Sequence, residues 1–207
     1  FGFAPPPPDP ESLLKSKLII MWGFNPAESI FGTNTNWYLA LAKERGCKFI
    51  FVDPRFADSA AALADRWIPI LPGTDTAMLI AMAYVLIKER LTDRGFLNKC
   101  VHGFESFRDY CLGVEDGIPK TPAWAEAICG VKAQVIADLA REYAASKPAD
   151  LRGGWSPGRT PFGEQFHRAC IALAAMTGNI GVPGGGAGCW VPQTFQRTLG
   201  VSYMPPF

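Results

Sequence analysis

Three short apolar runs and one short mixed segment predict the β-strands of this chain. The apolar runs cover residues 17–22, 48–52 and 67–71, and the mixed segment, Ala-Asp-Leu-Arg, covers 149–152. Runs of this length, rich in apolar residues and without strict alternation, are typical of a parallel sheet with both faces covered. The third run contains Pro69, which has no backbone N–H to donate and therefore favours an edge position or an irregular pairing.

The segments between these runs have the spacing of helices. In residues 131–145, for example, Val135, Ile136, Leu139 and Tyr143 fall on one helical face. Strands that alternate with helices predict an α/β fold, a Rossmann-like, doubly wound and mainly parallel sheet, with a helical insertion at about 92–130. The predicted helices cover residues 37–45, 59–65, 75–90, 93–101, 105–112, 122–129, 131–145 and 163–176.

The same pattern gives the expected domain limits. Residues 1–16, which begin with a proline-rich stretch, are predicted to be a linker. Residues 17–188 form the α/β domain, and residues 189–207 form an exit segment. The chain begins at Phe1 and shows no secretion-signal pattern, so we interpret it as a piece of a longer protein.

Composition excludes some functions. The formal net charge is +1, which gives no reason to expect nucleic acid or anionic lipid as a partner. No apolar run reaches the ~18 residues that a membrane-spanning helix needs. Hydrophobic residues make up 48% of the chain, which is enough for an ordinary globular core.

Neither the cysteines nor the histidines form a metal-binding pattern. There is no C-x-x-C pair, and neither His102 nor His167 stands beside a cysteine at zinc-site spacing. An iron–sulfur or structural zinc site within this chain is therefore not expected, and His167 is predicted to pack on its helix or face solvent. We expect all six cysteines to be small core residues, namely Cys47, Cys100, Cys111, Cys129, Cys170 and Cys189.

Glycines and polar residues follow the end of each predicted strand. The carboxyl ends of parallel strands meet at one sheet edge, where open α/β sheets bind ligands. Gly23 would allow a tight turn and close approach of a ligand. Asp53 could accept hydrogen bonds from ribose hydroxyls or from a base edge, and Asp75 could accept from the amino edge of a guanine. Arg55 could stack on or pair with a phosphate-bearing ligand. Residues 153–159, which follow the fourth strand, supply further glycines and a tryptophan.

Each of these residues also has a purely structural interpretation. Asp53 and the proline after it are common in turns, and Thr74 and Asp75 are common helix caps. Arg55 would then be a surface cation and Trp155 a core residue. The glycines at 184–186 favour either backbone contact with a ligand or a flexible link.

Three well-known site motifs are absent. The chain has no G-x-G-x-x-G after its first strand, which disfavours an ordinary NAD site. It has no G-x-x-x-x-G-K-[ST] of a P-loop ATPase. It also has no G-x-S-x-G of a nucleophile-elbow hydrolase.

The strand-end segments carry a family resemblance. They read WGFNPA at 22–27, VDPR at 52–55, ADRWIPILPGTD at 64–75, GWSPGR at 154–159 and AMTGNIGVPGGG at 175–186. In this order they resemble the molybdopterin oxidoreductase family, and within it the catalytic subunit of anaerobic dimethyl sulfoxide reductases. Residues 113–126 also resemble that subgroup.

The resemblance implies a molybdenum or tungsten ion held between two molybdopterin guanine dinucleotides, with this chain as the central domain that binds one of them. The residues that match the family's motifs are expected around the dinucleotide. They are Gly23, Asn25, Pro26, Ala27, Glu28 and Ser29 along it, Asp53, Pro54, Arg55, Gly73, Thr74 and Asp75 at its guanosine end, and Gly154, Trp155, Ser156 and Gly158 near the pterin.

The resemblance also implies what lies elsewhere. An iron–sulfur cluster and the protein ligand to the metal are expected outside this chain, so we assign no catalytic and no metal-binding residue within 1–207. The isolated chain should be inactive. Implied partners are the rest of the parent chain, an iron–sulfur electron-transfer subunit, a membrane-anchor subunit and a small oxidised substrate such as a sulfoxide or N-oxide, on the periplasmic side of a bacterial membrane. The alternative is a stand-alone nucleotide-binding or interaction module without redox activity.

Overall fold

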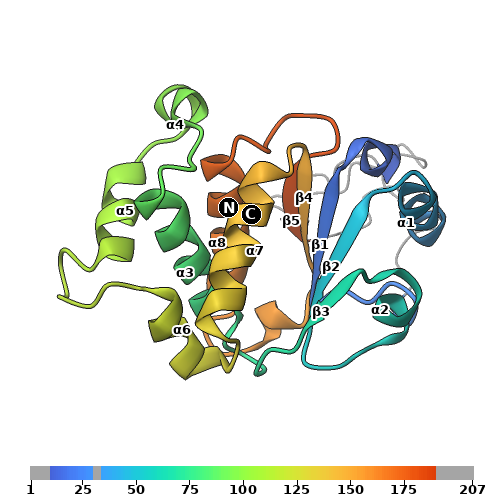
Figure 1. Cartoon of the computed structure of the whole chain (residues 1–207), viewed down its shortest axis with the longest axis horizontal. Coiled ribbons are helices and arrows are strands. Elements are labelled where there is room, and N and C mark those ends of the chain that lie inside the picture. Colours follow the sequence, from blue (N-terminus) through green and yellow to red (C-terminus); the bar gives the residue numbers. More distant parts are fainter. Residues whose placement is uncertain (1–9, 30–33, 190–207) are drawn as a thin grey trace, which may run out of the picture.

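A single five-stranded parallel sheet organises the computed structural model, which describes residues 10–29 and 34–189 (Figure 1). The strand order is β3-β2-β1-β4-β5, and all four pairings are parallel. The predicted doubly wound α/β fold is therefore confirmed. The strands are β1 (Leu18–Trp22), β2 (Lys48–Val52), β3 (Arg66–Ile68), β4 (Ala149–Gly153) and β5 (Gly186–Cys189).

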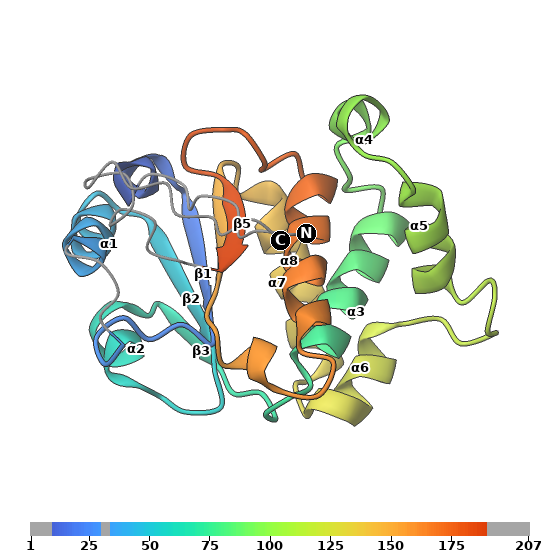
Figure 2. The same ribbon diagram turned by 180° about the vertical axis from the view of Figure 1, so that it is seen from behind.

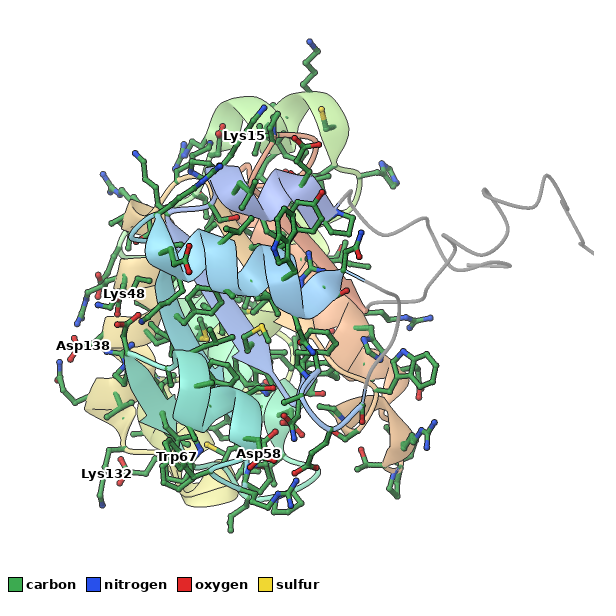
Figure 3. The ribbon with its side chains drawn as sticks, turned by 90° about the vertical axis from the view of Figure 1, so that its right-hand side faces the viewer. Lys15, Lys48, Asp58, Trp67, Lys132 and Asp138 are labelled. Carbon is green, nitrogen blue, oxygen red and sulfur yellow. The ribbon has the colours of Figure 1, made fainter. Side chains whose placement is uncertain are left out.

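Helices cover both faces of the sheet, as Figures 1 and 2 show from opposite sides. One face carries the short 3-10 helix η1 (Pro10–Lys15), α1 (Thr35–Glu44) and α2 (Asp58–Leu63), which Figure 3 shows in front of the strands. The other elements follow the chain from β3 to β5. They are α3 (Asp75–Lys88), α4 (Arg94–Cys100), α5 (Phe104–Leu112), α6 (Pro122–Cys129), α7 (Ala133–Ala145), η2 (Pro157–Arg159) and α8 (Glu164–Met176).

Strand side chains divide between two cores because successive residues point to opposite faces. Ile20 and Trp22 pack with the α3, α7 and α8 side chains in the larger core. Ile19 and Met21 pack with those of α1, α2 and η1 in the smaller one. Every residue of β1 is buried, which explains its unbroken apolar run.

The direction of winding changes between β1 and β4. From β1 the chain proceeds outward to β2 and then β3, whereas β4 lies on the other side of β1 and is followed outward by β5. Trp22 is level with both Val52 and Gly153, so the three central strands end together. A crevice at such a switch point is where open α/β sheets bind ligands.

The structure differs from the sequence predictions at the sheet edges. The third strand is an edge strand as predicted but ends at Ile68, directly before Pro69. Residues 186–189 form the parallel strand β5, whereas the sequence pattern predicts no strand there and starts an exit segment at 189. Glycine-rich strands lack the β-branched and aromatic side chains by which strands are recognised.

The predicted linker also needs correction at its carboxyl end. Residues 10–15 form η1, and Leu13 is buried in the smaller core. Ser16 donates from its hydroxyl to the carbonyl of Gly184, 2.7 Å away. These residues therefore belong to the folded domain. The rest of the predicted linker, over residues 1–9, and the exit segment over 190–207 lie outside the described residues.

The predicted helical insertion consists of α4, α5 and α6, which add no strand to the sheet. Thr121 caps α6 by accepting from the backbone N–H of Trp124, with proline at the next position. Thr74 occupies the N-cap position of α3, but its hydroxyl donates to the carbonyl of Leu71 and makes no cap bond. Within the described ranges, no helix has both the length and the apolar character to cross a membrane.

Most of the cysteines are core residues, as expected. Cys47, Cys111, Cys129 and Cys170 are buried, and burial raises the pKa of the Cys47 and Cys111 thiols to about 12. Cys100 is exposed, so the core prediction is wrong for it; it ends the short peripheral helix α4. The side chain of Cys189 lies outside what the structure describes.

One ion pair is buried inside the sheet layer. Arg152 donates from Nε and Nη2 to one oxygen of Asp150, at 3.0 and 2.5 Å, and both residues are at most 3% exposed. They stand opposite Ile19 and Met21 on β1, and so face the smaller core. Removing one partner would leave a charge in an apolar layer.

We predict that Arg152→Met lowers the free energy of unfolding by about 3–5 kcal/mol. The double variant Asp150→Leu with Arg152→Met should recover most of this loss, since no unpaired charge remains. Urea unfolding of the three proteins gives the comparison. Lys43→Met, which breaks the exposed pair between Lys43 and Asp65, is the control and should cost about 1 kcal/mol or less. A double variant as unstable as the single one would contradict the account.

Candidate functional site

A hollow of ≈ 390 Å³ opens at the carboxyl ends of β1, β2 and β4, at the switch point of the sheet. We call it the switch-point hollow. It brings together nine of the residues singled out in the sequence and adds Phe24 and Arg159. The nine are Gly23, Asn25, Glu28, Ser29, Asp53, Arg55, Gly154, Trp155 and Ser156.

The floor of the hollow is backbone. Gly154 donates its N–H to the carbonyl of Trp22 at 2.7 Å, and Gly23 donates to the carbonyl of Val52 at 2.9 Å. A Cβ on Gly154 would lie 1.7 Å from the Gly23 carbonyl oxygen, and a Cβ on Gly23 would lie 2.7 Å from Pro157. Gly23 also has φ +56°. Only glycine allows the two turns to approach this closely.

The turn after β1 is held by a residue that the sequence reasoning missed. Asn25 Oδ1 accepts from the hydroxyl and the backbone N–H of Ser59, at 2.6 and 3.2 Å. The Ser59 hydroxyl in turn accepts from the N–H of Ala27 at 3.0 Å. Asn25 Nδ2 is buried with no hydrogen-bond partner in the described part of the chain. This amide is therefore oriented by Ser59 and keeps a donor available to a ligand.

An ion pair forms one rim. Arg55 Nη2 donates to both oxygens of Glu28, at 2.5 and 2.7 Å, and both side chains are exposed. The backbone N–H of Arg55 donates to Asp53 Oδ1 at 3.0 Å. Burial raises the pKa of the half-buried Asp53 carboxyl, and this hydrogen bond opposes the rise. Asp53 thus combines a turn contact with a position on the hollow, so the two interpretations of this residue are compatible.

Asp75 does not line the hollow. It is 6% exposed at the first turn of α3, and its Oδ1 accepts from Trp22 Nε1 at 2.9 Å. Burial raises its pKa, and the indole hydrogen bond opposes the rise. The carboxylate thereby fixes the last side chain of β1. Its contact with a guanine stays a prediction.

The opposite wall comes from the turn after β4. Trp155 is half-buried there, and the Arg159 guanidinium lies 5.6 Å from its ring centre. Ser156 donates from its hydroxyl to the Gly23 carbonyl at 3.1 Å. Gly158 lies behind this wall, because a Cβ there would be 2.6 Å from Nε2 of His167. His167 is half-buried, and burial lowers its pKa.

The remaining predicted residues surround the hollow without lining it. Gly73 has φ +77° and packs near Thr160, which joins the loop before α3 to the turn after β4. The others outside the lining are Pro26, Ala27, Pro54 and Thr74. Arg159 could have been included from the sequence, since it ends the GWSPGR motif; Ser59 gave no signal, because it stands in an ordinary alanine-rich helix.

We predict that Gly154→Ala lowers the free energy of unfolding by about 3 kcal/mol or more, because the two turns must separate to admit the methyl group. Chemical denaturation measures the change. Gly46→Ala is the matched control: its φ is +85° and nothing lies within 4 Å, so only backbone strain of about 1–2 kcal/mol is expected. If the two variants lost equal free energy of unfolding, the close contact between the turns would contribute nothing to stability.

Ser59→Ala should cost about 1–3 kcal/mol, since Ala27 N–H loses its acceptor and Asn25 loses its shorter hydrogen bond. The distinguishing measurement is hydrogen exchange, in which the Ala27 amide should lose protection while the β1 amides keep theirs. Ser156→Ala, which removes an exposed hydroxyl, is the control and should leave the Ala27 amide protected. Unchanged exchange at Ala27 in Ser59→Ala would contradict the proposed anchoring.

The chain is similar in sequence to known proteins. Residues 9–198 match the family model of molybdopterin oxidoreductase. The dimethyl sulfoxide reductase DmsA of Escherichia coli (strain K12) is 40% identical over 86% of this chain and 24% of its own length. The trimethylamine-N-oxide reductase of Haemophilus influenzae is 37% identical over 86% of this chain and 22% of its own length.

A solved structure supports the same fold. The acetylene hydratase of Pelobacter acetylenicus superposes with a TM-score of 0.56 at 26% identity, over 78% of this chain and 20% of that one. The chain thus spans about a quarter of the length of the reductases it matches. By the family model and these relatives, the chain belongs to the molybdopterin oxidoreductase family and resembles a domain of the dimethyl sulfoxide and trimethylamine-N-oxide reductases.

Proposed function

We propose that this chain is the domain of a dimethyl sulfoxide reductase-like molybdoenzyme that binds one molybdopterin guanine dinucleotide. The observation that carries the proposal is the switch-point hollow, whose floor is the paired backbone of Gly23 and Gly154. A floor without side chains lets a bulky ligand approach main-chain groups closely. The position of the hollow, at the reversal of strand order, is the one at which dinucleotides bind in related sheets.

The groups that line the hollow fit a pyrophosphate-bearing ligand. Asn25 Nδ2 is a buried donor with no hydrogen-bond partner among the residues that the structure describes. Arg55 and Arg159 add two guanidinium groups, which bind phosphate oxygens in a forked geometry. Leaving a buried donor unsatisfied costs about 1–3 kcal/mol, so a ligand acceptor at this position would recover that cost.

The guanosine end would lie toward β2 and β3. Asp53 lines the hollow there, and its carbonyl accepts from Trp67 Nε1 at 2.9 Å. Trp67 packs edge-on against Phe56, with ring centres 5.4 Å apart, and both rings are partly exposed. An exposed aromatic pair beside a carboxylate suits a base that offers a flat face and N–H donors. Neither ring belongs to the residues that the sequence predicts at the ligand.

In the parent enzyme, the bound cofactor would supply two-electron oxygen-atom transfer, with a sulfoxide or N-oxide as the proposed substrate. The residues of this chain would bind and orient the dinucleotide. We place the metal ligand, the iron–sulfur cluster and the catalytic residues in other parts of the parent, so the isolated chain would be inactive. An iron–sulfur subunit, a membrane anchor and a periplasmic location remain proposals drawn from the resemblance.

We predict that Asp53→Asn weakens GDP binding to this chain about tenfold, which corresponds to ~1.4 kcal/mol. The wild-type chain should bind GDP more tightly than ADP, and isothermal titration calorimetry measures all these affinities. The substitution should not lower stability. Burial raises the pKa of Asp53 in the folded state. At a pH above the pKa that Asp53 has in the unfolded chain, its charged carboxylate therefore destabilises the folded state. Asparagine carries no charge, so at pH 7 the substitution removes this destabilisation.

The matched control is Asp58→Asn, which removes the same charge outside the hollow. Asp58 and Trp67 lie at the same end of the molecule (Figure 3). Loss of a nearby negative charge alone should strengthen binding of an anion slightly, so weaker binding in Asp53→Asn alone indicates a lost hydrogen bond. Equal affinities for GDP and ADP, or no heat of binding at millimolar GDP, would contradict a guanosine site on this chain.

A further inference from the structure

A second hollow, of ≈ 190 Å³, lies between the end of α3, helix α4 and the start of α5. We call it the arginine hollow. Its apolar lining comes from Ile87, Leu97 and Phe104, and it carries three arginines, Arg90, Arg94 and Arg108. Its lining shares no residue with that of the switch-point hollow. The arginine hollow is therefore separate from the switch-point hollow.

The arginines are poorly neutralised within the protein. Arg94 follows Asp93, but that carboxylate already accepts from the N–H of Phe96 and from Lys147, each at 2.9 Å. Arg108 contacts its neighbour Asp109. Within residues 10–29 and 34–189, the side chains of Arg90 and Arg94 have no ion pair. Glu105 is the carboxylate in the lining, so guanidinium groups outnumber it.

Helical spacing aligns the polar groups along both sides of the hollow. Arg94 and Asn98 are four residues apart on α4, and Glu105 and Arg108 are three apart on α5. Residues at these spacings share one helix face. The two helices thus present a basic residue and a hydrogen-bonding residue each, above an apolar floor.

Arg90 occupies a backbone conformation that usually selects glycine. It follows the cap of α3 with φ +58°, where the N–H of Leu91 closes the helix by donating to the carbonyl of Leu86 at 2.9 Å. A side chain at this position costs about 1–2 kcal/mol. Arg90 nevertheless occupies this position, and its guanidinium is the third at the hollow.

We propose that the arginine hollow is the docking site of an acidic protein segment that carries one apolar side chain. The apolar floor would take that side chain, and the guanidinium forks would bind the flanking carboxylates. Asn98 and Glu105 would bind the backbone peptide groups of the docked segment. The Glu105 carboxylate can accept a hydrogen bond from a backbone N–H, whereas it would repel a small free anion. The hollow is smaller than the ~300–1,000 Å³ typical of cofactor and drug-sized sites.

The test is fluorescence anisotropy of the 207-residue chain with the peptide Glu-Asp-Leu-Asp-Glu-amide, which carries fluorescein on its N-terminal amine. Arg94→Gln should weaken binding about five- to tenfold, as expected for the loss of one charge-assisted contact. Lys99→Gln, an exposed charge on the same helix outside the hollow, is the control and should change the affinity less than about twofold. Added salt should weaken binding of the acidic peptide.

A second variant separates binding from folding. Arg90→Gly removes a guanidinium and relieves the backbone strain, so it should weaken peptide binding about as much as Arg94→Gln while the melting temperature stays the same or rises. The proposal is overturned if the peptide does not bind at millimolar concentration, or if a peptide with Gln and Asn in place of the acids binds equally well. Displacement of the peptide by an equal concentration of succinate would also overturn it, because the ligand would then be a free acid.

Discussion

The contact between the backbones of Gly23 and Gly154 is the constraint on which the ligand edge depends. β1 and β4 are neighbours in the sheet, but the chain leaves them toward opposite faces, so their first turns cross. They cross at a separation that leaves no room for a side chain. Pro157 then covers Gly23, and Ser156 reaches its carbonyl. This closes one side of the switch-point hollow and fixes where its two walls begin.

The carboxylates at this edge have distinct roles. A sheet edge that binds a phosphate-bearing ligand should not present unpaired negative charge, because it would repel the phosphate. Two carboxylates at this edge are accordingly paired or directed into the core. Glu28 is paired with Arg55 at the rim, and Asp75 accepts from the indole of Trp22 within the core. Asp53 remains as a half-buried acceptor facing the hollow. A single such carboxylate favours a ligand that brings donors of its own, as guanosine does.

Sequence patterns predicted the features that depend on local side-chain character. The apolar runs located β1 and β2, and the short segment before Gly153 located β4. The strand-end positions, together with the family resemblance, located nine lining residues of the hollow. What they missed depends on tertiary contact. β5 has glycines at two of its four positions, so its strand conformation comes from pairing with β4. Ser59 is brought to Asn25 by the fold alone, and Cys100 is exposed because α4 is peripheral.

Helix α3 connects the two hollows and sets the distance between them. Its first residue, Asp75, holds the last residue of β1 beside the switch-point hollow, and Arg90, just past its end, lies at the arginine hollow. The 14 residues of α3 span about 21 Å, and eight of them are buried. Energetic coupling between distant sites requires an element with two alternative arrangements. A helix so packed provides a rigid spacing, so a segment docked at one end would be held at a fixed position relative to the dinucleotide edge without altering it.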